Sequence, residues 1–222
     1  MPQYKVVEKF ISINGEGVFA GQLAVFIRFQ GCNLSCSFCD TSWANAADAP
    51  FTFMTEYQIY DYIKETGIKN VTLTGGEPLL VPDILILIQL LATDQFLRIE
   101  IETNGSIDLD PFVGISNSPA FTMDYKLPGS LMEASMLVSN FDILAKKDTV
   151  KFVVGSAKDL NRAKDIITKY DLTAKCHVYI SPVFGSIELE EIVNYLIDNS
   201  LNDVTMQIQM HKVIWDPNKR GV

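Results

Sequence analysis

Three cysteines lie close together in the stretch 31–40, which reads GCNLSCSFCD. Cys32, Cys36 and Cys39 have the spacing C-x3-C-x2-C. A structural zinc site normally takes four protein ligands, whereas cysteine thiolates also hold iron–sulfur clusters. Three thiolates without a fourth suit a metal centre that needs an open coordination position. The spacing therefore favours an iron–sulfur cluster with one iron left free to bind a small molecule.

Other uses of these cysteines stay open at this point. A zinc site would need a fourth ligand, for which Cys176, His177 and His211 are the only remaining Cys or His residues. A thioredoxin-like redox pair of Cys36 and Cys39 would leave Cys32 unexplained. Cys176 opens an apolar run, and we expect it to be a core residue.

Composition indicates one globular domain over residues 1–222. Hydrophobic residues make up 48% of the 222 residues, and 18 Lys and Arg against 27 Asp and Glu give a net charge of −9. Such an acidic chain is poorly suited to phosphate backbones, so we expect no nucleic-acid partner. The stretch 1–10 does not read as a signal peptide, and the apolar run 84–92 is too short to span a bilayer. We expect a cytoplasmic protein, without a membrane partner, in which the thiols stay reduced and 84–92 forms a buried helix.

The pattern of elements predicts an α/β fold. Helical patterns cover 55–67, 158–170 and 188–199, and they alternate with strand-like runs. The chain is shorter than a full eightfold barrel, so we expect a partial, open βα barrel of about six parallel strands. The strand-like runs are 5–13, 24–29, 71–74, 97–102, 121–125, 150–154, 177–181 and 204–209.

Each candidate motif directly follows one of these strands. The cysteine stretch follows 24–29, and GGEP at 75–78 follows 71–74. TNG at 103–105 and KLPG at 126–129 follow the next two strands. In parallel sheets, functional loops gather beyond the carboxyl ends of the strands. We therefore expect the four motifs to meet at one end of the barrel.

The glycine pair Gly75 and Gly76 permits close approach of the backbone to a ligand. Glu77 adds a carboxylate, and Asn104 and Lys126 follow neighbouring strands. On their own these residues are equally compatible with ordinary turns and solvated loops.

The cysteine spacing, with Phe38 before the last cysteine and GGEP some forty residues later, resembles the radical S-adenosylmethionine superfamily. The resemblance implies that Cys32, Cys36 and Cys39 are catalytic and hold a 4Fe–4S cluster, whose open iron binds S-adenosylmethionine and whose electron cleaves it to a 5′-deoxyadenosyl radical. The residues that it assigns to the cofactor are Phe38, Cys39, Asp40, Gly75, Gly76, Glu77, Asn104, Asp124, Tyr125, Lys126, Ser181, Pro182, Val183 and Phe184.

Within that superfamily, the N-terminal stretch 12–41 resembles the 7-carboxy-7-deazaguanine synthase family. The shared pieces are GEG at 15–17, Gly21, FIR at 26–28 and the Cys-Asp-Thr that ends at Thr41. The ending 207–222 is also similar. Many members carry Gln where this chain has Asn14, which leaves the contact of that residue with the substrate in doubt.

This family converts 6-carboxy-5,6,7,8-tetrahydropterin to 7-carboxy-7-deazaguanine with release of ammonia, a carbon–nitrogen lyase reaction that leads to queuosine and other 7-deazapurines. The resemblance implies Mg²⁺ bound by Thr41, a one-electron donor such as flavodoxin or ferredoxin, and a homodimer. It also implies an N-terminal strand extension and a C-terminal segment that closes the substrate site. The residues that it assigns to the substrate are Ile13, Asn14, Gly15, Glu16, Arg28, Thr74 and Val222.

Two alternatives remain. An activating enzyme for glycyl-radical proteins would share the cysteine loop and GGEP, but such enzymes commonly have His-Asn in place of Asp40 and Thr41. A zinc-binding interaction module would be no enzyme at all. Iron and sulfide content distinguishes zinc from a cluster, and turnover of the pterin distinguishes the synthase from the activating enzyme.

Overall fold

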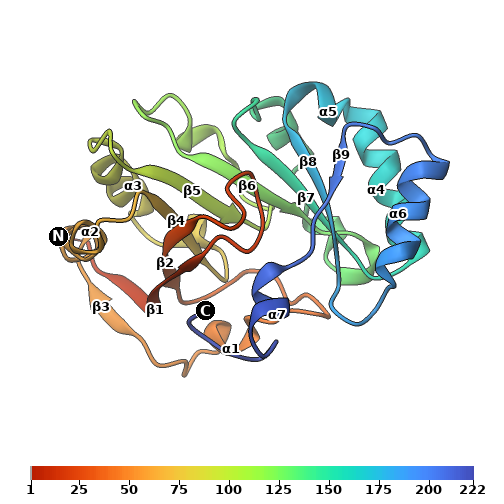
Figure 1. The fold of residues 1–222 in the computed structure, drawn as a ribbon. Helices are drawn as coiled ribbons and strands as arrows, with labels where there is room; N and C mark the ends of the chain where they lie inside the picture. The colour runs from red at the N-terminus through yellow and green to blue at the C-terminus, as the bar shows by residue number, and fades with distance from the viewer. Residues whose placement is uncertain (1) are drawn as a thin grey trace.

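The computed structural model describes residues 2–222, which form an α/β fold around one nine-stranded sheet (Figure 1). The strand order is β3-β1-β2-β4-β5-β6-β7-β8-β9. The strands are β1 (Tyr4–Ile13), β2 (Leu23–Phe29), β3 (Thr52–Met54), β4 (Asn70–Gly75), β5 (Arg98–Thr103), β6 (Ala120–Tyr125), β7 (Thr149–Val154), β8 (His177–Pro182) and β9 (Val204–Met206).

Seven of these strands, β2 and β4 to β9, run parallel, and β1 joins them as an antiparallel extension between β2 and β3. The sheet is open, with β3 and β9 at its two ends. The prediction of an open parallel βα barrel is confirmed. The parallel strands number seven rather than about six, because the short β9 pairs with β8 at the end of the sheet.

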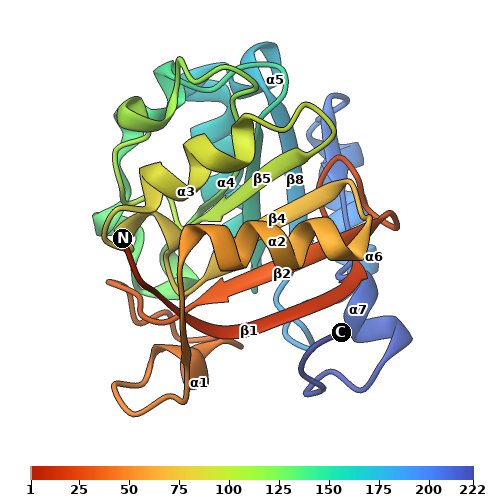
Figure 2. The same cartoon turned by 90° about the vertical axis from the view of Figure 1, so that its left-hand side faces the viewer.

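Helices cover the outer side of the sheet. Figures 1 and 2 show α2 and α3 outside the first strands and α4 and α6 outside the last ones. The helices are α1 (Ser42–Asn45), α2 (Glu56–Thr66), α3 (Ile84–Ala92), α4 (Ala157–Tyr170), α5 (Leu172–Lys175), α6 (Leu189–Asp198) and α7 (Met210–Ile214). Short 3₁₀ turns lie at Pro78–Leu80, Asp110–Phe112, Pro128–Ser130, Glu133–Ser135 and Val138–Asp142.

The ends of α2 follow from local chemistry. Thr55 and Gln58 form a reciprocal capping box, in which each side chain binds the other residue's backbone N–H. Gly67 ends the helix in the left-handed conformation, with φ of 66°. The run 84–92 forms the buried helix α3 as predicted, with Leu87, Ile88 and Leu91 fully buried. Between residues 2 and 222, every helix is too short or too polar to cross a membrane.

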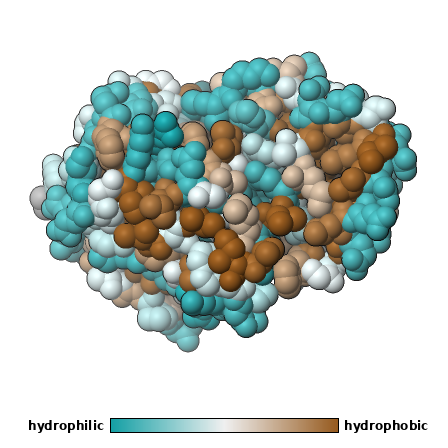
Figure 3. Space-filling model, viewed as in Figure 1, coloured by the Kyte–Doolittle hydropathy of each residue, from teal (hydrophilic) through white to brown (hydrophobic). Residues whose placement is uncertain are grey.

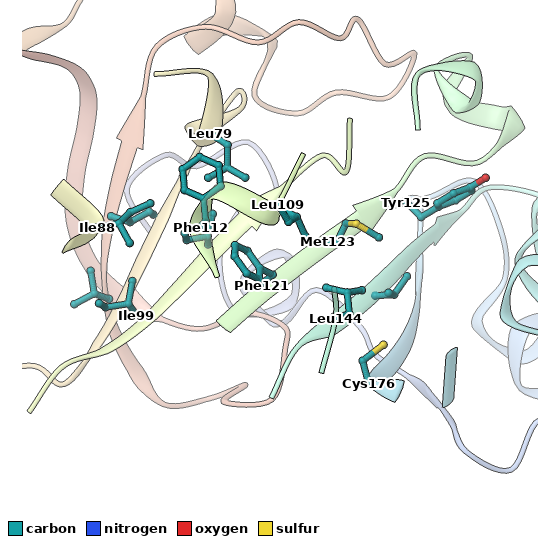
Figure 4. Packing of buried hydrophobic residues seen from close by; sticks show 14 of the residues in the cluster. Leu79, Ile88, Ile99, Leu109, Phe112, Phe121, Met123, Tyr125, Leu144 and Cys176 are labelled. Carbon is teal, nitrogen blue, oxygen red and sulfur yellow. The ribbon is translucent and has the colours of Figure 1, made fainter. Parts of the chain in front are cut away.

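The core fills the space between the sheet and its helices (Figure 4). Cys176 is buried there, as predicted, and its thiol donates to the Leu172 carbonyl oxygen at 3.5 Å. Burial raises the pKa of Cys176 to about 11, so it stays a neutral thiol. Cys176 is therefore a packing residue.

The helix α6 buries less of its apolar face than its sequence pattern implies. Ile192 is buried, but Leu189 and Val193 are 45% and 42% exposed. Figure 3 shows apolar surface at the right-hand side of the molecule, where α6 lies in Figure 1. The cause is position, because α6 packs beside β9, a three-residue edge strand that covers only part of the helix.

Candidate active site

A cavity of about 600 Å³ lies where the carboxyl ends of the parallel strands meet the cysteine loop and the C-terminal segment. Nineteen of the residues assigned from the sequence line it, and five do not. Those that line it are Ile13, Gly15, Glu16, Arg28, Cys32, Cys36, Phe38, Cys39, Asp40, Thr41, Thr74, Gly75, Gly76, Asn104, Asp124, Lys126, Val183, Phe184 and Val222.

The alternation of side chains along the strands decides which residues face this cavity. Glu102 on β5, Asp124 on β6 and Lys151 on β7 point inward. The strand residues next to them that belong to the hydrophobic core are Ile101, Met123, Tyr125, Val150 and Phe152. Tyr125 is accordingly buried in the core, with its ring 5.7 Å from that of Phe141 (Figure 4). The Tyr125 side chain therefore lies on the face of β6 opposite the cavity, and only the backbone of this residue is left for the expected contact with the cofactor.

The three thiols of the cysteine loop are free, half-buried and on the cavity wall. Backbone N–H of Leu34 and the side-chain amide of Asn104 donate to Cys32 Sγ at 3.4 and 3.6 Å. Burial raises the pKa of the Cys36 and Cys39 thiols. Metal binding would have to supply the positive charge that deprotonates them, and an iron–sulfur cluster does so. The donor set fits such a cluster.

The geometry leaves zinc little support. Cys176 is in the core, and His177 stacks on Tyr179 with ring centroids 6.3 Å apart. Neither residue lines the cavity, although His211 does.

The glycine pair lets two loops pack directly against each other. A Cβ on Gly76 would overlap the Gly31 carbonyl oxygen and Asn45 Oδ1, and one on Gly75, whose φ is +148°, would overlap the Phe29 carbonyl oxygen. The Glu77 N–H donates to that same Gly31 oxygen at 2.9 Å. The glycines therefore dock the GGEP loop onto the cysteine loop and keep the cavity open above both.

Glu77 lies behind this wall rather than on it. Its carboxylate is buried and accepts hydrogen bonds from the Asn104 N–H at 2.6 Å, the Leu79 N–H at 3.0 Å and the Thr103 hydroxyl at 3.0 Å. Burial raises the pKa of this carboxyl. The structure thus makes Glu77 a bracket that holds the Asn104 loop against the glycine loop, and does not bring it to the cavity surface.

Glu16 is the most heavily supported carboxylate on the wall. The Ser181 hydroxyl donates to Oε1 at 2.6 Å, and Lys151 Nζ and Gln209 Nε2 approach Oε2 at 3.1 and 3.4 Å. Burial alone would raise the pKa of Glu16, but Lys151 and the other donors hold it below its usual value. Ser181 is therefore a support for Glu16 rather than a lining residue, and the buried Pro182 likewise stays behind the wall.

Asn14 also lies behind the wall. Its Oδ1 accepts from the Thr72 hydroxyl at 3.2 Å, while its Nδ2 is buried without a partner anywhere in residues 2–222. In this conformation the Asn14 side chain, which is shorter than that of glutamine, is bound by Thr72 on β4.

Three further groups on the wall have specific polar contacts or a free acceptor. Arg28 Nε pairs with Glu8 at 3.1 Å, and the Thr74 hydroxyl donates to Glu102 at 2.7 Å. Asp124 Oδ2 pairs with Lys126 at 2.8 Å, whereas its Oδ1 is buried with no partner among the residues that the structure describes. An acceptor left free in a cavity wall is suited to a ligand hydroxyl or ammonium group.

The C-terminal segment closes one side of the cavity. Lys212 pairs with Asp40 at 3.0 Å, and the Arg220 guanidinium lies 3.9 Å from the centre of the Trp43 ring. Burial would raise the pKa of Asp40, but Lys212 holds it below its usual value. Both ribbon views show α7 and the C-terminus at the same lower end as α1 (Figures 1 and 2). These contacts join the last residues of the chain to the cysteine loop.

The sequence interpretation missed Lys151, Gln209 and Lys212, and it named His211 only as a possible zinc ligand. For Lys151 a signal exists, because it is the only charged residue in the strand TVKFVV. A charge in an otherwise apolar strand of a parallel sheet must face a polar interior or a partner. Gln209, His211 and Lys212 lie at the start of α7, a helix of only five residues, which is too short for periodicity to indicate which side chains point inward.

The open parallel barrel and the three thiols on its cavity define a radical S-adenosylmethionine enzyme. A model of the radical SAM superfamily matches residues 26–113. A 7-carboxy-7-deazaguanine synthase from Clostridium acetobutylicum is 64% identical over 219 residues, which cover 99% of each chain. One from Chlorobaculum tepidum is 33% identical and covers 98% of this chain and 96% of that one. The chain belongs to the 7-carboxy-7-deazaguanine synthase family.

A solved structure adds the fold. The crystal structure of QueE from Escherichia coli matches with a TM-score of 0.72 over 94% of this chain and 95% of that one, at 22% identity. The family prediction is confirmed by the two relatives at 64% and 33% identity. A 4Fe–4S cluster and S-adenosylmethionine follow as cofactors from membership of the superfamily.

Proposed function

We propose that this chain converts 6-carboxy-5,6,7,8-tetrahydropterin to 7-carboxy-7-deazaguanine with release of ammonia. One observation carries the proposal. The three thiols of the cluster loop and the supported carboxylate Glu16 line the same cavity, so a cofactor on the thiols and a pterin on Glu16 can meet inside it. Full-length similarity to proteins named 7-carboxy-7-deazaguanine synthase supports this choice over a glycyl-radical activating enzyme.

The residues of the cavity divide into two halves. In the cofactor half, Cys32, Cys36 and Cys39 hold the cluster, which when bound supplies the electron for cleavage of S-adenosylmethionine. The free Asp124 Oδ1 is available to the cofactor's hydroxyl or ammonium groups. The remaining candidates for this half are Phe38, Asp40, Gly75, Gly76, Asn104, Lys126, Val183 and Phe184.

In the substrate half, Glu16 accepts hydrogen bonds from the amino and imino groups of the pterin edge. Arg28 pairs with Glu8 through Nε, and its terminal nitrogens can bind the substrate carboxylate. Ile13, Gly15 and Thr74 shape the surrounding wall, and the Val222 carboxylate closes it from the C-terminal side. The chain's own contribution is to orient the substrate and to exclude water.

The finer assignments belong to the same proposal. The Thr41 hydroxyl, which faces the cavity and donates to Asp40 at 3.2 Å, would bind Mg²⁺ together with water and substrate oxygens. The enzyme takes its electron from flavodoxin or ferredoxin and acts as a cytoplasmic homodimer. Residues 1–222 form one domain, in which β1 and β3 are the N-terminal extension and residues 210–222 close the substrate site.

Turnover under strictly anaerobic conditions tests the function. The protein is first reconstituted with iron and sulfide and then supplied with S-adenosylmethionine and a chemical reductant. It should convert the carboxytetrahydropterin to 7-carboxy-7-deazaguanine, and chromatography with mass spectrometry detects the product. Activity should rise on addition of Mg²⁺ to chelator-treated enzyme, and Thr41→Val should lose that response. Protein that holds a full cluster and cleaves S-adenosylmethionine but leaves the pterin unchanged would refute the substrate assignment.

A further inference from the structure

Lys151 is a half-buried lysine that lines the cavity, and the roles described so far leave it without a task. It lies on β7, its side chain is 13% exposed, and it lines the cavity. Its ammonium group is 3.1 Å from Glu16 Oε2 and 3.9 Å from Asp124 Oδ2. The lysine therefore bridges a carboxylate of the substrate half and one of the cofactor half.

Through these contacts Lys151 joins parts of the chain that are far apart in sequence. Glu16 comes from the loop after β1 and receives its second strong hydrogen bond from Ser181 on β8. Asp124 comes from β6, and the oxygen that faces Lys151, Oδ2, also pairs with Lys126 at 2.8 Å. The order Glu16, Lys151, Asp124, Lys126 alternates in charge and crosses the cavity from the substrate half to the cofactor half.

We propose that Lys151 is a positioning residue that fixes the Glu16 carboxylate in the orientation and charge state that bind the pterin edge. This inference rests on the proposed function, since it assumes that Glu16 is the group that meets the pterin. Lys151 acts through Glu16 and need not touch the substrate itself.

The charges around the lysine explain why the position needs a cation. A carboxylate that accepts from two N–H groups must be ionised, yet burial and other carboxylates nearby disfavour its charge. Lys151 offsets both effects and is held charged by the same neighbours, so its own pKa is raised despite burial. The titratable and charged groups that face Glu16 and Lys151 are Glu100 and Glu102 on β5, Asp124 and Lys126 at the end of β6, and Asp40, His211 and Lys212 beside the C-terminal segment.

Removal of the ammonium group should change the charge state of Glu16. In Lys151→Met, Glu16 keeps its burial and its acidic neighbours but loses its counter-charge. Its pKa then rises, and the carboxyl is partly protonated at neutral pH. Binding of the pterin should weaken at neutral pH and recover as the pH is raised. In the parent chain, binding should change little over the same range, because Lys151 keeps Glu16 ionised throughout.

Binding of 6-carboxypterin, the oxidised and air-stable form of the substrate, provides a measurement that does not depend on turnover. Its dissociation constant is measured by fluorescence with the cluster-loaded enzyme between about pH 6 and pH 7.5, a range in which the pterin ring keeps its own N–H proton. We expect Lys151→Met to weaken binding at pH 7 by at least about 30-fold, as for the loss of one partner of a buried charge pair. Lys151→Arg keeps the charge and should stay within roughly 5-fold, with a flat pH profile.

Kinetics and a second site sharpen the test. Lys151→Met should raise KM for the carboxytetrahydropterin far more than it lowers kcat, because Lys151 orients a binding group. Ser181→Ala removes the other donor to Glu16, so its effect should be smaller in the Lys151→Met background than in the parent chain, as for two residues that act through one carboxylate.

Several results would overturn the inference. These are binding by Lys151→Met that equals the parent at every pH, a loss of binding that is the same at all pH values, or a fall confined to kcat. If Lys151→Met does not fold, Lys151→Gln serves as the second neutral variant, and failure of both to fold would assign Lys151 a purely structural role. Parent enzyme that neither binds 6-carboxypterin nor turns over the substrate would refute the proposed function instead.

Discussion

A substitution of Glu77 can show whether this residue supports the two loops or contacts the cofactor directly. Replacing Glu77 by Gln keeps the size of the side chain and exchanges one carboxylate oxygen for an NH₂ group. Oε2 receives the Asn104 N–H at 2.6 Å, and Oε1 receives the Leu79 N–H at 3.0 Å. Whichever way the new amide turns, its NH₂ group must face one of these two backbone donors.

The magnitude can be worked from those contacts. One hydrogen bond to a charged acceptor is lost, worth about 1.5–3 kcal/mol, and one backbone N–H is left buried without an acceptor, at a cost of about 1–3 kcal/mol. Part of this loss is offset because glutamine carries no charge. The raised pKa of Glu77 shows that burial disfavours its charged form, and the substitution removes that unfavourable free energy. We expect a net loss of about 2–3 kcal/mol in the free energy of unfolding. For a chain of this length that lowers Tm by roughly 4–12 °C.

Urea denaturation in the absence of S-adenosylmethionine measures this effect, both with and without reconstituted cluster. Glu65→Gln, an exposed change of the same chemistry on α2, is the matched control and should stay within about 0.5 kcal/mol. If Glu77→Gln keeps the parent stability but loses binding of S-adenosylmethionine, Glu77 reaches the cofactor and the bracket interpretation fails.

Three further changes test other parts of the site. Cys36→Ala should abolish bound iron and visible absorbance after anaerobic reconstitution, and retention of both would contradict the cluster assignment. Burial, with Glu102 adding to it, raises the pKa of Glu100 to about 7, above the usual 4.5 of the unfolded chain. The folded chain therefore keeps a proton that the unfolded chain releases, and the parent loses stability as pH rises from about 4.5 to 7. Glu100→Gln should remove that loss and gain up to about 3 kcal/mol above pH 7 in urea titrations, and an unchanged pH dependence would count against it. Gly76→Ala should lower Tm and cluster content together, because its Cβ overlaps the backbone of Gly31, and normal values for both would refute the docking of the two loops.

Local patterns were sufficient for much of the fold. The capping residue Thr55 and the stop at Gly67 define α2, and the uninterrupted apolar run 84–92 defines the buried helix α3. Alternation of strands with helices then indicates a parallel sheet, because each crossover must return the chain to the same end. These signals lie within a few residues of one another, so the sequence displays them directly.

Sequence patterns did not predict the surroundings of side chains whose neighbours come from distant parts of the chain. Tyr125 lies beside Asp124 at the carboxyl end of β6, yet the pleat of the strand sends its side chain into the core. Leu189 and Val193 share the apolar face of α6 with Ile192, but the short edge strand leaves them exposed. In both cases the residue type is right for the element, and its surroundings come from other parts of the chain.

By itself the sequence determined the chemistry of the cofactor loop, because three thiols with the spacing C-x3-C-x2-C predict a metal centre without any residue from elsewhere in the chain. It also determined the family, through motifs near both ends of the chain. Only the tertiary structure decided how the polar groups are shared. Lys151 meets Glu16 across 135 positions, and Ser181 meets the same carboxylate across 165. Whether a buried charge is paired, free or neutral depends on distances of a few ångströms between strands. Those distances are set by how the strands lie side by side in the open sheet, and no spacing along the chain encodes them.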